Sequence, residues 1–87
     1  MKIHINVKIV MIRSGISLFK LAQLLELEPT FLSRCIGGKE KMPESMSKKL
    51  AEFFKIPREI LFGDQREYFK YVLRQLEQEA NENKKNS

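Results

Sequence analysis

The fold of this chain is decided by residues 16–39, which read ISLFKLAQLLELEPTFLSRCIGGK. Two short apolar runs recur there at helical spacing, with Leu21, Leu24 and Leu25 in the first and Leu32, Cys35 and Ile36 in the second. The break between the runs has room only for a tight turn, and Ala22 is small where two helices must cross closely. A helix pair of this kind offers its second helix to the major groove of DNA. DNA binding is therefore the first hypothesis.

Length and composition describe one small domain. A chain of 87 residues with 43% hydrophobic and 31% charged residues is expected to fold and to stay in solution, and an all-α domain of this size can bury a sufficient core. The sequence has no apolar run of membrane-spanning length and no pattern of a secretory signal, so no membrane contact is expected. The lone Cys35 excludes an internal disulfide and suits a reducing compartment, which predicts a cytoplasmic protein.

The positive charge lies on one part of the chain. Residues 1–63 hold 11 Lys or Arg against 6 Glu, which gives +5, whereas residues 64–87 hold 5 basic against 5 acidic residues. A surface that binds phosphate requires such an excess. Ordinary solubilising charge explains the excess equally well when it is taken alone, but together with the helix pair it favours DNA.

Capping residues and periodicity predict further helices on both sides of this pair. The expected helices are 6–14, ending at Gly15; 18–25, capped by Ser17; 29–36, with Pro29 in the first turn and Gly37 and Gly38 ending it; 44–54; a short one that Pro57 opens and that ends near Phe62; and a last one from Gln65. The buried face of helix 44–54 is expected to comprise Met46, Leu50, Phe53 and Phe54.

The N-terminus permits two interpretations. Ile3, Ile5, Val7 and Ile9 alternate with polar residues as in a strand, but Val7 and Val10 also share one helical face. We favour an extended arm over residues 1–5 followed by a helix with Asn6 as its N-cap. Ile9 and Ile12 leave that helix apolar nearly all round, so a further element is expected to cover it.

The last helix carries an apolar stripe. Asp64 and Glu67 have the spacing of a capping box at its start, and the stripe comprises Phe69, Val72, Leu73, Leu76 and Ala80. The stripe either docks within its own chain or pairs with a second copy, and we favour dimerisation through Phe69, Val72, Leu73 and Leu76. The chain is thus divided into a body over residues 1–63, a dimerisation or buttress helix over 64–82 and a frayed tail over 83–87.

From about Val7 to Gly63 the sequence resembles the Cro and lambda-repressor-like, or XRE, family of helix-turn-helix regulators. The residues that carry the resemblance are Gly15-Ile16-Ser17, Leu21-Ala22, Leu24-Leu25, Leu32-Ser33-Arg34, Gly38-Lys39, Pro43, Leu50-Ala51 and the segment from Ile56 to Phe62. The resemblance implies an all-α fold, a five-helix bundle here followed by an additional C-terminal helix. It also implies binding to a double-stranded DNA operator, usually as a homodimer.

Several positions depart from the family pattern, and four of them bear on packing and turns. Where the family often pairs an Arg in the first helix with a Glu late in the third, this chain has Met11 and Ile36, and replacing a buried ion pair by packed apolar residues is often neutral or stabilising. Glu26 stands where the family has a turn glycine, so backbone strain of about 1 kcal/mol is expected. Lys55 replaces glycine at a similar helix end.

The predicted DNA contacts fall into two groups. Arg34 can make a bidentate contact to guanine, and Pro29, Thr30 and Phe31 share its helix, where Thr30 and Phe31 can touch thymine methyl groups. The phosphate group comprises Ser17, Lys20, Ser33, Lys39 and Lys41. Three of these residues have an alternative role: Arg34 could pair with Glu28 or Glu40, Phe31 could belong to the core or to an interface, and Ser17 could simply cap its helix.

An enzyme is not expected. Cys35 shares the buried side of its helix with Leu32, and the only histidine, His4, lies in the predicted arm, so no nucleophilic pair is evident. One Cys and one His cannot form a zinc site, and the sequence indicates no cofactor.

Two functions remain. The first is a transcriptional regulator, typically a repressor, that reads an operator through its third helix and is controlled by its concentration or by a regulatory protein. The second is a protein-interaction module on the same fold, an anti-repressor or co-regulator, that docks through an apolar patch of Leu18, Phe19, Pro29 and Phe31. Leu18 stands where the family often has Gln, and with Pro29 and Phe31 it makes the predicted reading face unusually apolar, which favours the second function. The localised charge favours the first.

Overall fold

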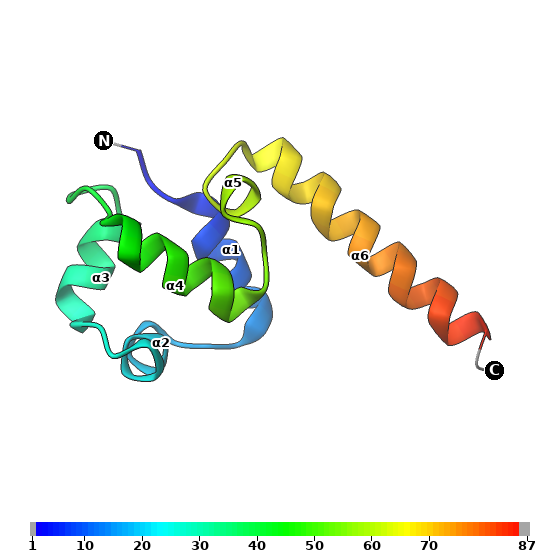
Figure 1. Cartoon of the computed structure of the whole chain (residues 1–87), viewed down its shortest axis with the longest axis horizontal. Coiled ribbons are helices and arrows are strands. Elements are labelled where there is room, and N and C mark those ends of the chain that lie inside the picture. The colour runs from blue at the N-terminus through cyan, green and yellow to red at the C-terminus, as the bar shows by residue number, and fades with distance from the viewer. Residues whose placement is uncertain (1, 86–87) are drawn as a thin grey trace.

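The computed structural model describes residues 2–85, with side chains for residues 2–80, and contains helices without any strand in that range. The helices are α1 (Ile5–Ser14), α2 (Leu18–Leu25), α3 (Pro29–Ile36), α4 (Glu44–Phe54), α5 (Arg58–Leu61) and α6 (Gln65–Lys85). Helices α1 to α5 form a compact body, and α6 projects from one side of it as a long rod (Figure 1). The prediction of an all-α chain is confirmed.

The N-terminal prediction was right in outline and wrong in detail. Residues 2–4 form no regular structure, and the backbone N–H of His4 donates to the Ile36 carbonyl at 2.9 Å, which ties the arm to the end of α3. Helix α1 begins at Ile5, so Asn6 is not its N-cap. Asn6 is instead only 2% exposed, and its Nδ2 donates to the carbonyl oxygens of Gly63 at 3.0 Å and Ile60 at 3.4 Å. Asn6 therefore fastens α1 to the connection between α5 and α6.

The boundaries of α2 and α3 follow the predictions closely. Ser17 caps α2, because its Oγ accepts the backbone N–H of Lys20 at 3.1 Å. Helix α2 ends at Glu26, which adopts the left-handed conformation with φ 55° and ψ 45°. The turn formed by Glu26, Leu27 and Glu28 connects it directly to α3. The predicted strain at Glu26 thus has its structural basis, since positive φ brings a side chain's Cβ close to the following carbonyl.

Glu26→Gly is expected to hold or raise the free energy of unfolding. Glycine adopts positive φ without the steric penalty of about 1 kcal/mol, which offsets its greater entropy in the unfolded chain. Chemical denaturation of both proteins measures the difference. Glu52→Gly, inside α4, is the control and should cost about 1 kcal/mol. A loss of more than about 1 kcal/mol in Glu26→Gly would show that this turn is not strained.

Helix α4 packs a narrower face than predicted. Met46, Leu50 and Ala51 are buried, and Phe54 is half-buried, but Phe53 is 38% exposed and its predicted burial was wrong. Phe53 packs edge-on against Phe54, with ring centroids 5.0 Å apart. Lys55 ends α4 with φ 57°, the second left-handed residue that is not glycine among those described.

Helix α6 contacts the body only over its first turns. Tyr68 is fully buried in the core, and Tyr71 and Val72 pack against the core from the same side. Phe69, Leu73 and Leu76 are 46%, 58% and 46% exposed. The helix continues to Lys85, beyond the predicted end at 82, so the predicted tail is helical over 83–85, while 86–87 lie outside the described residues. None of the described helices combines the length and apolar character needed to cross a membrane.

Candidate nucleic-acid interface

Helix α3 is amphipathic, and its two sides separate core residues from candidate reading residues. Leu32, Cys35 and Ile36 are buried against the body. The opposite side exposes four of the predicted contact residues, namely Thr30, Phe31, Ser33 and Arg34, whereas Pro29 in the first turn is half-buried. Phe31 is 37% exposed, so it belongs to the surface of the helix rather than to the core. The exposed side of α3 therefore presents a hydroxyl pair, one aromatic ring and one guanidinium group.

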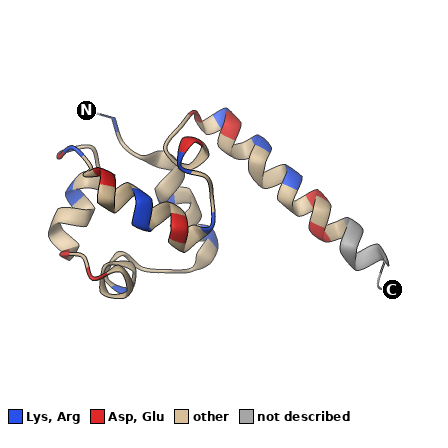
Figure 2. Ribbon diagram, in the orientation of Figure 1, with Lys and Arg blue, Asp and Glu red and all other residues tan. Residues whose placement is uncertain are grey.

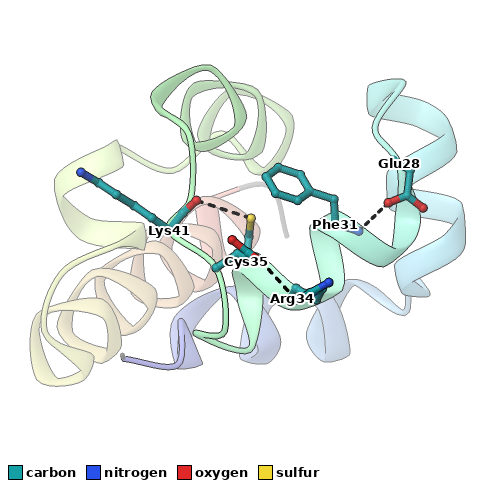
Figure 3. A network of polar contacts seen from close by, with 6 residues as sticks. Glu28, Phe31, Arg34, Cys35 and Lys41 are labelled. Carbon is teal, nitrogen blue, oxygen red and sulfur yellow. Dashed lines mark hydrogen bonds and ion pairs between the residues drawn. The ribbon is translucent and has the colours of Figure 1, made fainter.

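Arg34 already has a partner in the free protein. Its Nη2 lies 3.2 Å from Glu40 Oε1, one of the two pairings weighed for it, and both side chains are about half exposed, at 55% and 43% (Figure 3). An exposed ion pair of this kind contributes only about 0–1 kcal/mol. Another acceptor can therefore replace Glu40 at little cost, and the guanidinium remains available to a ligand.

Glu28 is the N-cap of α3. Its Oε2 accepts the backbone N–H of Phe31 at 2.7 Å (Figure 3). Its Oε1 accepts the backbone N–H of Thr30 at 3.0 Å. These backbone hydrogen bonds, with that of Thr30 contributing most, lower the pKa of the Glu28 carboxyl below its ordinary value. The carboxylate thus stabilises the start of the helix, where unpaired N–H groups favour negative charge. It also places a negative charge at the end of α3 that would enter a groove of DNA.

Protonation of the Glu28 carboxylate is expected to lower the free energy of unfolding in acid. Because the folded protein lowers the pKa of this carboxyl, its contribution is fully present above the ordinary value of 4.5 and is lost as the pH falls through the folded value. We therefore expect the difference in unfolding free energy between wild type and Glu28→Gln to shrink below about pH 4.5. Chemical denaturation from pH 7 to pH 3 measures it. A difference that stays constant across this range would exclude a stabilising role for the charge.

The predicted phosphate contacts are all exposed, but the structure gathers only some of them. Ser17, Ser33 and Lys39 line one hollow together with Arg34. Lys20 on α2 and Lys41 in the loop after α3 lie outside that hollow. The Lys41 side chain extends away from α3 (Figure 3). Basic residues follow α3 in this loop, whereas the turn that precedes α3 carries acidic residues (Figure 2).

We call this hollow the α1–α3 groove. It has a volume of about 800 Å³ and lies between the second half of α1, the start of α2 and the end of α3. Its apolar lining comprises Met11, Ile12, Ile16, Leu18 and Ile36. Its basic lining comprises Lys8, Arg34 and Lys39, and no Asp or Glu takes part in it. Met11 and Ile36, the apolar pair inferred to replace an ion pair, both line this groove.

The groove was not predicted from the sequence, although several of the residues that line it were. The apolar docking patch was predicted over Leu18, Phe19, Pro29 and Phe31, and only Leu18 of these four lines the groove. Phe19 is 73% exposed on α2. The remaining apolar lining comes mainly from α1 and from the residue before Ser17. The one available signal was the surplus of apolar residues on helix α1, where Ile12 is 80% exposed.

Cys35 is part of the core, as predicted. Its side chain is fully buried, and the Sγ donates to the Lys41 carbonyl at 3.8 Å. Burial, with a smaller contribution from Glu40, raises the pKa of the thiol, which keeps it protonated and unreactive. Within the described part of the chain, no three His, Cys, Asp or Glu residues gather as a metal site would require.

Comparisons with protein-family models, with curated proteins and with solved structures found no match to this chain.

Proposed function

We propose that this protein is a sequence-specific, DNA-binding transcriptional regulator of the Cro and lambda-repressor type, a cytoplasmic binding protein rather than an enzyme. In this proposal α1 to α5 are the five-helix bundle and α2 and α3 are its helix-turn-helix. The observation that carries it is the geometry of this unit. Two helices of eight residues each are joined by a tight turn, and the second exposes Thr30, Ser33 and Arg34 while burying its other side.

Helix α3 would enter the major groove. Arg34 would leave Glu40 and bind the O6 and N7 atoms of a guanine, and Thr30 and Phe31 would contact thymine methyl groups. Ser17, Ser33 and Lys39 would hold the sugar-phosphate backbone beside it, with Lys20 and Lys41 as outer contacts. This arrangement uses the excess positive charge of residues 1–63.

The protein would bind its operator as a homodimer. A single module of this size buries too little surface for tight operator binding. Phe69, Leu73 and Leu76 form an exposed apolar stripe on α6, which a second copy would cover. Val72 belongs mainly to the contact of α6 with its own body, because it packs against the core. Two-fold symmetry would place the two copies of α3 about 34 Å apart, or a multiple of that distance.

Arg34→Ala and Lys39→Ala are expected to weaken DNA binding in different ways. Loss of a bidentate base contact should cost about 1–3 kcal/mol and relax the preference at one operator position. Loss of a phosphate contact should weaken binding to all DNA sequences alike. It should also make the slope of log affinity against log salt concentration less negative by about 0.9. A duplex selected from a random library, measured by fluorescence anisotropy between low and high salt, provides both quantities. Lys48→Ala, an exposed lysine on α4, is the control.

Two results would count against the proposal. If Arg34→Ala and Lys39→Ala weaken all duplexes equally, Arg34 contacts only phosphate. If neither changes affinity, or if no duplex is enriched, the exposed side of α3 does not read DNA, and protein docking becomes the better explanation.

A further inference from the structure

The α1–α3 groove has an apolar lining that DNA binding does not explain. A sugar-phosphate backbone matches Lys8, Arg34 and Lys39 but offers nothing to a cluster of aliphatic side chains. Ile12 is nevertheless 80% exposed beside this groove, and Met11, Ile16 and Leu18 are only partly buried. Large exposed apolar patches that are rimmed by polar residues mark protein-interaction sites or ligand-binding grooves. The groove therefore calls for an occupant with both apolar and acidic groups.

We propose that the groove binds an amphipathic, acidic peptide segment of a regulatory protein, and that this segment excludes DNA. Its apolar side chains would lie on Met11, Ile12 and Leu18, and its carboxylates would pair with Lys8, Arg34 and Lys39. The exclusion of DNA rests on the proposed function, because Arg34 and Lys39 would serve both ligands. The peptide would take Arg34 from Glu40, as an operator guanine would, so the two ligands compete for the same cations.

Charge complementarity identifies the class of partner. Three basic residues and no acidic residue line the groove, and Lys8 and Lys39 keep it positive even while Arg34 is paired with Glu40. Acidic segments are therefore attracted and basic ones repelled. The volume of about 800 Å³ is large enough for several apolar side chains but falls within the range of a single ligand site. A second copy of this chain is a poorer occupant. A contact between this groove and a different surface of another copy would be head-to-tail and would not close into the symmetric dimer that an operator requires.

The test uses a defined probe and the full-length chain. The probe is a fluorescent peptide of about 12 residues, roughly 18 Å as a helix, with Leu and Ile on one face and Glu on the other. Its partner probe has Lys in place of every Glu. Fluorescence polarisation without DNA measures docking, and the selected duplex measures DNA binding in a separate titration. A third titration adds the acidic peptide to the preformed DNA complex.

The variants separate the groove from the DNA-reading residues. Ile12→Ser is expected to weaken acidic-peptide binding about fivefold or more and to leave DNA binding unchanged. Phe19→Ser is its matched control, because Phe19 is 73% exposed but does not line the groove. Lys8→Gln should lower the affinity for the acidic peptide about threefold, and Lys48→Gln should leave that affinity unchanged.

The proposal is supported if the acidic peptide binds, the Lys peptide does not, Ile12→Ser and Lys8→Gln weaken binding selectively, and the peptide displaces DNA. It is overturned if the acidic peptide does not bind, if the controls weaken it equally, or if peptide and DNA occupy the protein together. If Ile12→Ser weakens DNA binding as strongly as it weakens peptide binding, the proposal is also overturned, since DNA would then occupy the groove. If peptide docks but no duplex binds, the docking site stands and only the proposed function fails.

Discussion

If the proposed dimer forms through α6, Leu73→Glu is expected to convert it to a monomer and to reduce the affinity for the proposed DNA operator at least about 100-fold, a loss of about 3 kcal/mol. Leu73 lies at the middle of the stripe formed with Phe69 and Leu76, and it is the most exposed of the three at 58%. A carboxylate buried there without a partner would oppose its own copy across the two-fold axis. Because the side chain is exposed in the single chain, the body should remain folded.

Sedimentation velocity over a range of protein concentrations measures the state of assembly, and anisotropy with the selected duplex measures affinity. Gln78→Glu is the matched control, since it adds the same charge to α6 at a position outside the stripe. Circular dichroism confirms that each variant is helical. A wild-type protein that stays monomeric at high micromolar concentration, or a dimer unchanged by Leu73→Glu, would remove α6 from the interface.

Tyr68→Ala is expected to reduce the free energy of unfolding by about 3–5 kcal/mol, the usual cost of truncating a buried aromatic side chain. Tyr68 is fully buried, and it is the largest of the fully buried side chains described. Its loss would leave a cavity where α6 meets the body. For a small domain such a loss is a large share of the total stability.

Tyr68→Phe separates the ring from the hydroxyl. The Tyr68 hydroxyl is buried and has no hydrogen-bond partner among the described residues, so its removal should leave stability unchanged or raise it. Urea denaturation of wild type and both variants at one protein concentration gives the three values. A cost below about 1 kcal/mol for Tyr68→Ala would show that α6 is not anchored in the core.

The sequence predicted local structure well because its signals are local. The limits of α2, α3 and α4 follow from Ser17, Pro29 and the helix-ending residues, whereas the strained position at Glu26 was expected from the resemblance, because the family has a turn glycine there. Each of these helix limits depends on a few neighbouring residues. Capping and fixed proline geometry act within one turn of helix, so a single sequence is enough to find the helix limits that they set.

Most of the errors concern residues whose partners are distant along the chain. Asparagine is favoured at the N-cap of a helix, which is why Asn6 was predicted there. The carbonyl groups that Asn6 contacts lie 54 and 57 residues away, and its burial against them overrides the local preference. Tyr68 was left out of the predicted stripe because α6 uses two faces, one toward the core and one exposed. The groove was missed for the same reason, since three helices must be assembled before its apolar and basic residues meet.

Tyr68 and Phe69 are neighbours in sequence with opposite environments, and in the proposed dimer this would make the stability of the fold depend on the protein's concentration. One completes the core and the other belongs to the stripe that a second copy would cover, so the same turn of α6 serves both. Association would hold that turn in place and thereby protect the body from unfolding, by mass action. A scarce protein would be less stable and more rapidly degraded than an abundant one. A regulator built in this way would persist only above a threshold concentration, even before it meets DNA.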